Sequence, residues 1–397
     1  MPAPDRWPST WSAADGKNTS LGFAPIAAKV KAMGMKLGIH IMRGVSLAAV
    51  AAETPVLGFE GRYTAADIAN TSDAALCPWW KGVRSVNMSH PAGQAFYDSL
   101  YTQYAEDWGV AFVKNDCVFG NQFVPDQIHA QAKSIRTVAS RRPGSAPIVY
   151  SLSPGGGFAE ATLDIGTIAP TISADVNMYR VTGDDWDSWG AVASHFGVAA
   201  RAANASLVGA EGLGAPGSRS WPDLDMLPFG AVTTPNSAGR LPHHNSSLSR
   251  AQQHAQMTLW AVAKSPLMFG GEATRLDDFT RGLLGNAEVL ALNAHSSDNR
   301  AVASTGRTAS GRPFADAVAW GASLGDKTYV ALFNTGTHSS GTVAVALRDL
   351  GLKGAQACDV FDVWGGAPAP AASCAGGQVS ADVAETSVVL YRLTKCV

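Results

Sequence analysis

The sequence is poor in charge. Of its 397 residues only 16% are charged, against 46% that are hydrophobic, and the formal net charge is -2. Basic residues do not cluster with aromatic residues, so the electrostatic signature of nucleic-acid binding is missing. No apolar run reaches the roughly 18 residues that a membrane-spanning helix requires. We therefore expect a globular protein with a large core, no nucleic-acid partner and no membrane partner.

Sequence signals for a leader and for a metal are also scarce. The amino end, MPAPDRWPST, has neither the basic start nor the apolar middle of a signal peptide. HExxH and CxxC motifs do not occur. His243 and His244 lie in a loop rich in Pro and Asn, which favours a surface position over metal ligation. We expect neither a metal nor a cofactor.

The chain has only five cysteines, too few for a fold built on disulfides but enough for one or two bridges. Cys358 and Cys374 flank a short loop rich in Pro and Ala, a spacing that suits a bridged hairpin. Cys77 and Cys117 can pair if the fold brings them together. Cys396 is then left over.

Helical patterns alternate with short strand-like runs over the first three quarters of the chain. The pairs are 25–34 with 36–42, 93–108 with 109–116, and 127–140 with 147–154, and further apolar runs occupy 175–180, 207–212 and 266–271. Repeated helix-then-strand units predict a parallel α/β sheet, either open or closed into a (β/α) barrel. Polar residues at the run ends favour the barrel, which collects catalytic groups there. They are His40, Arg43, Lys114, Asp116, Tyr150, Ser153, Asn177 and Arg180.

The pattern changes after Asn293. Short Val/Ala/Thr/Tyr runs separated by turn residues, such as TYVALFNT and SVVLYRL, are typical of a small antiparallel β domain. We therefore expect a catalytic barrel domain over 1–295 and an antiparallel β domain over 296–397 that packs on it.

The stretch WGVAFVKNDC, residues 108–117, carries two opposite charges out of an apolar strand. Side chains two apart share a face, so Lys114 and Asp116 point the same way, into the interior of a barrel. A neighbouring ammonium favours the ionised carboxylate, which makes Asp116 a candidate nucleophile. The alternative is a structural ion pair at a strand end.

Two later stretches supply further carboxylates. NMYRVTGDDWDSW, residues 177–189, places three aspartates, an arginine and two tryptophans just beyond a strand, although Asp184, Asp185 or Asp187 could instead cap the following helix. WPDLDML, residues 221–227, offers Asp223 and Asp225 on one face. Two carboxylates from different strands, one ionised and one protonated, are what glycoside hydrolysis requires.

At this point the ordered blocks resemble family 27 of the glycoside hydrolases, the α-galactosidase or melibiase group, in its plant-type branch. WGVAFVKNDC resembles the strand-four motif, and RVTGDDWDSW, WPDLDML and LWAVAKSPLMFGG resemble three later blocks in the same order. The similarity covers most of residues 1–295, and the β tail resembles the family's carboxyl-terminal domain. It implies a (β/α)8 barrel followed by an antiparallel β sandwich.

The resemblance also implies roles for individual residues. Asp116 falls on the nucleophile and Asp184 on the acid/base of a retaining mechanism, with their carboxyl groups about 5–5.5 Å apart. Substrate-binding roles fall on Lys114, Arg180, Asp225 and Trp189, to which the strand ends add Tyr150, Ser153, His40 and Arg43. Family habit further suggests a bridge between Cys77 and Cys117.

The chain departs from the family pattern in two ways. The two strands that normally precede PIAAKVKAMG, with an Asp-Asp pair on the second, are missing, so we expect a truncated barrel of strands three to eight. Ser153 stands where typical α-galactosidases carry a Glu-containing segment that reads the sugar 2-hydroxyl. The alternatives to an α-galactosidase are therefore a β-L-arabinopyranosidase, which accepts the same ring configuration, and an inactive carbohydrate-binding remnant.

The resemblance implies a carbohydrate substrate and a secreted, secretory-pathway or vacuolar location. The sequence leaves the oligomeric state open, with a dimer as one alternative.

Overall fold

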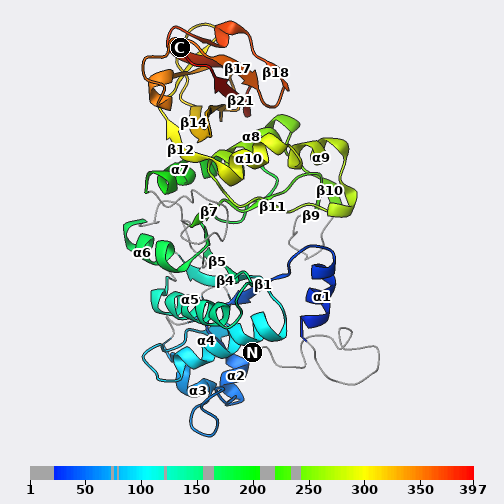
Figure 1. Cartoon of the computed structure of the whole chain (residues 1–397), viewed down its shortest axis with the longest axis vertical. Helices are drawn as coiled ribbons and strands as arrows, with labels where there is room; N and C mark the ends of the chain where they lie inside the picture. The colour runs from blue at the N-terminus through cyan, green and yellow to red at the C-terminus, as the bar shows by residue number, and fades with distance from the viewer. Residues whose placement is uncertain are drawn as a thin grey trace. The chain divides into compact units, whose positions relative to one another are not determined.

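The computed structural model describes residues 22–72, 76–77, 80–119, 123–154, 165–205, 220–233 and 243–397. The chain forms two compact units, Met1–Arg180 and Val181–Val397 (Figure 1). The run 207–212, predicted as a short strand, lies outside the described residues. The boundary near residue 295 between a catalytic and a carboxyl-terminal domain stays a prediction.

A parallel sheet forms the centre of the first unit. Strands β1 (Gly38–Met42), β4 (Phe112–Phe119), β5 (Val149–Pro154) and β6 (Met178–Arg180) are neighbours in that order and pair in parallel. Helices α4 (Gly93–Thr102) and α5 (Pro125–Ser140) precede β4 and β5 and lie beside one another (Figure 1). The predicted helix-then-strand order of this region is confirmed.

Shorter elements complete the first unit, and local sequence signals start several of them. Pro25 lies in the first turn of α1, and Thr64 and Asp67 form a capping box around α3. The remaining elements are α1 (Ala24–Ala32), β2 (Val45–Ser46), α2 (Leu47–Ala51), α3 (Ala65–Ile68), β3 (Val83–Arg84), the π-helical η4 (Gln103–Asp107) and α6 (Ile165–Asp175).

The second unit begins with short strands and five helical segments. Strand β8 pairs in parallel with β11, and β9 pairs antiparallel with β10. Ser249 and Gln252 form the capping box that starts α8. The elements are α7 (Trp189–Asn204), β7 (Trp221–Asp223), β8 (Met226–Leu227), β9 (Ala231–Thr233), β10 (His243–Asn245), α8 (Arg250–Val262), β11 (Met268–Phe269), η7 (Ala273–Arg275), α9 (Asp278–Leu284) and α10 (Ala287–His295).

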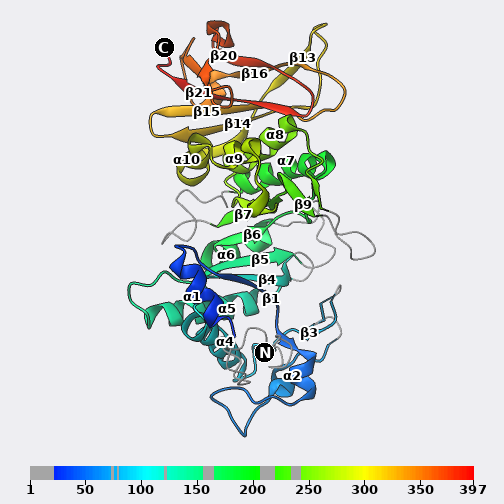
Figure 2. The same ribbon diagram turned by 90° about the vertical axis from the view of Figure 1, so that its right-hand side faces the viewer.

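An antiparallel β sandwich follows (Figure 2), as the sequence predicted. One sheet has the order β12-β14-β15-β21-β17-β18 and the other β13-β16-β20-β19. Buried aliphatic residues such as Leu332, Val343 and Val379 fill the core between them. The elements are β12 (Ser297–Val302), β13 (Thr305–Thr308), β14 (Ala317–Leu324), β15 (Lys327–Asn334), β16 (Gly341–Ala346), η8 (Leu347–Leu350), β17 (Asp359–Asp362), β18 (Ala367–Pro368), η9 (Ala371–Ser373), β19 (Cys374–Ala375), β20 (Gln378–Val383) and β21 (Ser387–Thr394).

The sandwich packs on helices of the same unit. The indole N–H of Trp364 donates to Thr258 Oγ1 of α8 at 2.8 Å. Arg392 of β21 forms an ion pair of 2.6 Å with Glu288 of α10. Phe196 of α7 meets Phe333 edge to face, with ring centroids 4.9 Å apart. Polar and aromatic contacts therefore join the sandwich to the preceding helices.

The disulfides differ from the sequence expectation at the carboxyl end. Cys358 bonds to Cys396, and Cys374 is a free, buried thiol, so the predicted pairing of Cys358 with Cys374 is wrong. The reason is the strand register. Strand β17 pairs with β21 so that Asp359 lies opposite Thr394, which brings the flanking residues Cys358 and Cys396 together, with Cα atoms 4.1 Å apart.

In the described parts of the chain, every helix is too short or too polar to span a bilayer. No group of three or more His, Cys, Asp or Glu side chains is placed there to hold a metal ion.

A buried lysine joins three segments of the second unit. Lys264 follows α8 with a positive φ of 57° and is 1% exposed. Its ammonium donates to the carbonyls of Asn293 and Ser296, both at 2.8 Å, and lies 4.8 Å from the centre of the Trp221 ring. Burial lowers the pKa of Lys264 to about 8.

We expect Lys264→Met to lower the melting temperature, because two buried carbonyls lose their donor at a cost of about 1–3 kcal/mol. Between the folded pKa of about 8 and the ordinary 10.5, the unfolded chain binds a proton that the folded chain does not, so the lysine's contribution to stability rises with pH. Thermal unfolding from pH 7 to pH 10 should show a widening gap between wild type and variant. The exposed Lys353→Met is the control, and a constant gap would contradict the assignment.

Candidate active site

Strand β4 presents two different faces. Val113 and Asn115 are fully buried, whereas Lys114 and Asp116 are partly exposed. The amide of Asn115 donates to Gln131 Oε1 of α5 at 2.9 Å, so the buried face is the one that α5 covers. Lys114 and Asp116 therefore share the opposite face, as the alternation of the strand predicted.

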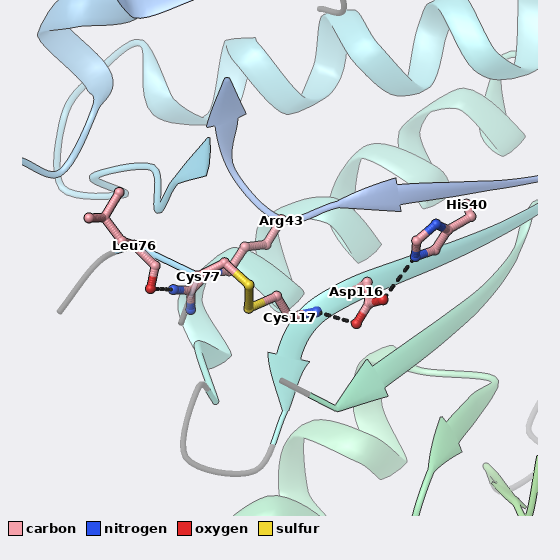
Figure 3. Close-up of a disulfide and its surroundings, with 6 residues drawn as sticks. All are labelled: His40, Arg43, Leu76, Cys77, Asp116 and Cys117. Carbon is pink, nitrogen blue, oxygen red and sulfur yellow. Dashed lines mark hydrogen bonds and ion pairs between the residues drawn. A yellow bond between two sulfur atoms is a disulfide. The ribbon is translucent and has the colours of Figure 1, made fainter. Parts of the chain in front are cut away.

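Both oxygens of the Asp116 carboxylate accept hydrogen bonds (Figure 3). Oδ1 accepts from the backbone N–H of Cys117 at 2.6 Å, and Oδ2 lies 2.9 Å from Nε2 of His40. His40 comes from β1, the parallel neighbour of β4. The Asp116 side chain is 13% exposed, so a partner in solution can reach a carboxylate whose orientation is fixed.

The side chain that contacts Asp116 is not the one that the sequence suggested. Among the described residues Lys114 makes no ion pair with Asp116. The alternative prediction, a structural ion pair between these two side chains, is therefore wrong. Residues two apart on one strand, such as Lys114 and Asp116, have Cα atoms about 7 Å apart. The register of β1 on β4 places His40 opposite Lys114, and from there its imidazole reaches Asp116.

A disulfide ties the loop around Cys77 to the end of β4. Cys77 and Cys117 are bonded, with Cα atoms 6.1 Å apart, as the family resemblance implied. Arg43 is 1% exposed, and its guanidinium donates to the carbonyl of Leu76 at 2.9 Å (Figure 3). Burial lowers the pKa of Arg43. This arginine, predicted to bind sugar, follows β1 and makes a hydrogen bond to the loop that carries Cys77.

Strand β5 adds hydroxyl groups on both faces. Tyr150 lies on the helix-covered face, where its oxygen accepts from the amide of Asn115 at 3.1 Å, so it does not share the face of Asp116. Ser151 lies opposite Lys114 in the register and is fully buried, and its hydroxyl has no hydrogen-bond partner in the described part of the chain. Ser153 follows on the same face as Ser151 and is 5% exposed. Strand alternation from Ser153 would have identified Ser151, which the sequence analysis missed.

In the second unit, the three aspartates of the 184–187 loop have different surroundings. Asp185 is fully buried, and its Oδ2 accepts from Gln256 at 2.6 Å. Asp187 accepts from the backbone N–H of Ser247 at 2.7 Å. Asp184 alone among the three is exposed.

None of these aspartates caps the next helix, since the side chain of Ser188 accepts from Ala191 N–H at the start of α7. The helix-capping alternative is therefore wrong, and the loop keeps two aspartates as anchors and presents one to solvent.

Asp225 lies in a constrained turn beside this loop. It has a φ of 78°, a left-handed conformation that is strained for a residue with a side chain. Its N–H donates to Asp223 Oδ1 at 2.8 Å, and its carbonyl accepts from the indole of Trp260 at 2.8 Å. Its Oδ2 accepts from the N–H of Asp185 at 2.6 Å. The turn thus joins the WPDLDML block directly to the aspartate loop.

Two predicted positions have structural contacts of a different kind. His244, expected at the surface, lies 3.0 Å from Asp187 Oδ2 through Nε2 and so helps to anchor the aspartate loop. The indole N–H of Trp189 donates to the carbonyl of Thr335 in the sandwich at 3.1 Å. The polar group of this side chain is therefore engaged within the protein. Its contact with a sugar stays a prediction.

Arg180 is the last residue of β6 and is 1% exposed. It ends the first unit, and Asp184 follows four residues later in the second. The separation of about 5–5.5 Å between the carboxyl groups of Asp116 and Asp184, which a retaining mechanism requires, stays a prediction.

The family was tested by comparison with known proteins. Residues 81–295 match the family model described as alpha galactosidase A, and residues 315–393 match the alpha galactosidase C-terminal beta sandwich domain. The chain belongs to glycoside hydrolase family 27, the α-galactosidase or melibiase family. It has the predicted fold class, a barrel-type α/β part followed by an antiparallel β sandwich.

Individual relatives agree with this assignment. The crystal structure of a family 27 β-L-arabinopyranosidase from Geobacillus stearothermophilus is 32% identical, with a TM-score of 0.79 over 99% of this chain and 80% of that one. Curated α-galactosidases from Oryza sativa and Coffea arabica are 26% and 27% identical over 72% of this chain. This family 27 member spans 57% and 64% of their lengths.

We expect Asp187→Ala to lower the free energy of unfolding by about 1.5–3 kcal/mol, because the N–H of Ser247 loses its hydrogen bond to a charged carboxylate. Burial raises the pKa of Asp187, but hydrogen bonds from Ser247 and His244 outweigh it and hold the pKa below its ordinary value. The stabilisation is therefore present above pH 4 or so and is lost as the pH falls through the folded pKa. Melting temperatures at pH 7 and pH 3 should show the gap closing in acid. Asp107→Ala, an exposed site, is the control, and an equal gap at both pH values would count against the anchor.

Proposed function

We propose that this family 27 member is a retaining exo-glycosidase that removes terminal α-D-galactosyl groups from oligosaccharides or glycoconjugates. The observation that carries the proposal is the carboxylate of Asp116. It lies near the carboxyl end of a parallel strand, both of its oxygens are oriented by hydrogen bonds, and its face of the sheet also bears Lys114. Such a fixed carboxylate is suited to attack on a bound sugar.

The proposed reaction has two steps. In the first, Asp116 attacks the anomeric carbon while Asp184 protonates the departing oxygen, which leaves a glycosyl ester on Asp116. In the second, Asp184 removes a proton from water, the water attacks the same carbon, and the ester bond to Asp116 breaks. The exposure of Asp184, in contrast to the buried Asp185 and Asp187, suits a group that exchanges protons with ligand and water.

Polar residues around these carboxylates are proposed to bind the sugar hydroxyls. Lys114 shares the face of Asp116, and Ser153 is the last residue but one of β5. Arg180 ends β6, and Asp225 lies beside the aspartate loop. Neutral hydroxyl groups suit such donors and acceptors, and a chain of net charge -2 attracts no particular charged substrate.

A β-L-arabinopyranoside is the second candidate substrate. The structure of the Geobacillus enzyme, 32% identical over nearly the whole chain, favours it, and a variant of that enzyme has been solved in complex with arabinose. Ser153 in place of the family's Glu-containing segment points the same way. The two sugars share a ring configuration, so one site can be tested with both.

The two disulfides support the proposed secretory location. Cys77–Cys117 and Cys358–Cys396 are bonds of the kind that persist in oxidising compartments.

Release of nitrophenol from the α-D-galactoside and the β-L-arabinopyranoside tests the activity. We expect Asp116→Asn to lower kcat by on the order of 10⁴-fold, because the nucleophile is lost. Asp107→Asn, on an exposed helical turn of the same unit, should leave kcat unchanged. A folded wild type that binds but turns over neither glycoside would favour the inactive remnant, and full activity of Asp116→Asn would remove Asp116 from the reaction.

Asp184→Ala should affect the two steps unequally. Nitrophenol departs without much help from an acid, so the first step persists, while loss of the base slows the second by about 10²–10⁴-fold. Added azide needs no base and should restore turnover, giving the α-glycosyl azide from the α-glycoside. An inverted azide product, or no rescue in a folded variant, would contradict the acid/base role.

A further inference from the structure

We propose that His40 is a positioning residue that stabilises the carboxylate of Asp116 as it departs from the sugar in the second step. The inference rests on the proposed function and assigns to His40 a role in one half of the reaction, beyond the sugar contact expected from its place at a strand end.

The hydrogen-bond geometry fixes the direction of the interaction. An ionised carboxylate only accepts hydrogen bonds, so Nε2 of His40 carries the proton that it donates to Asp116 Oδ2 across 2.9 Å (Figure 3). Oδ1 already accepts from Cys117 N–H at 2.6 Å. The carboxylate therefore has two donors, one from its own strand and one from β1.

The charge on Asp116 changes in opposite senses in the two steps. During attack on the sugar the carboxylate loses negative charge, so a donor to it favours the starting state and gives the first transition state no advantage. During hydrolysis of the ester the carboxylate regains that charge, so the same donor favours the second transition state. His40 should therefore speed the second step selectively.

The surroundings of His40 are consistent with this assignment. The imidazole side chain is 51% exposed, so its position depends mainly on the bond to Asp116. Lys114 lies opposite it in the register of β1 and β4. Among the described residues, His40 contacts no carboxylate other than Asp116, and Lys114 forms no ion pair. The hydrogen bond to Asp116 is therefore the interaction through which His40 is expected to act.

The test is steady-state and pre-steady-state kinetics of His40→Phe with the better nitrophenyl glycoside. A hydrogen bond to a charged group is worth a factor of about 10–100, so we expect kcat to fall by that factor. KM should fall in parallel, kcat/KM should stay within about threefold, and a burst of nitrophenol equal to the enzyme concentration should precede the slow phase. His40→Gln, which keeps an N–H donor, should recover most of kcat and lose the burst.

The matched control is His129→Phe. His129 is another exposed histidine, 3.0 Å from the carboxylate of Asp175. It joins α6 to α5, which covers the face of the sheet opposite Asp116. Its loss should leave kcat, KM and the burst unchanged.

Three outcomes would overturn the inference. Equal falls in kcat and kcat/KM without a burst would place His40 in the first transition state. A rise in KM at constant kcat would make it a sugar-binding residue only. Additive melting-temperature shifts for His40→Phe, Asp116→Asn and the double variant would show that the pair does not form in solution, and this measurement needs no turnover. An inactive wild type, in contrast, would be a failure of the proposed function itself.

Discussion

The need to satisfy the Asp116 carboxylate with hydrogen bonds accounts for the local arrangement of β1, β4 and the Cys77 loop in the first unit. A carboxylate held at the end of a buried strand is costly unless donors satisfy it. One donor is the N–H of Cys117, whose φ of 60° is an unusual conformation for a residue with a side chain. The disulfide to Cys77 anchors that same residue. The other donor, His40, is available only because β1 pairs with β4 in the observed register.

In the second unit the same need for satisfied carboxylates separates three neighbouring aspartates. Asp185 and Asp187 are buried because Gln256, Ser247 and His244 supply donors, and these come from α8, from the loop before it and from β10. Asp184 directly precedes them in the sequence and is exposed. The hydrogen bonds of the two buried carboxylates anchor the loop and thereby set the position of Asp184.

Features that depend on one segment were predictable, and features that depend on register were not. The two faces of β4 follow from the period of a strand, and the sandwich follows from its repeated short apolar runs. The partner of Asp116 and the bridge from Cys358 to Cys396 depend on which residues lie opposite one another across strands, and the sequence alone does not contain that alignment. The contact of His244 with Asp187 was not predictable, because the two residues are 57 positions apart.

The two faces of the parallel sheet differ in what covers their polar groups. On the helix-covered face, Asn115 bonds to Gln131 and to Tyr150, although Asn115 Oδ1 and Gln131 Nε2 have no partner in the described part of the chain. Helix α5 covers these atoms, so no ligand reaches them from that side. On the face of Asp116, the buried hydroxyl of Ser151 has no partner in the described part of the chain, and the neighbouring Lys114 has no ion pair with Asp116. An unsatisfied buried hydroxyl costs about 1–3 kcal/mol, a cost that water or the hydroxyls of a bound sugar can offset. A neutral, polyhydroxylated ligand supplies both donors and acceptors, which is the reason this face suits a sugar better than a charged or apolar molecule.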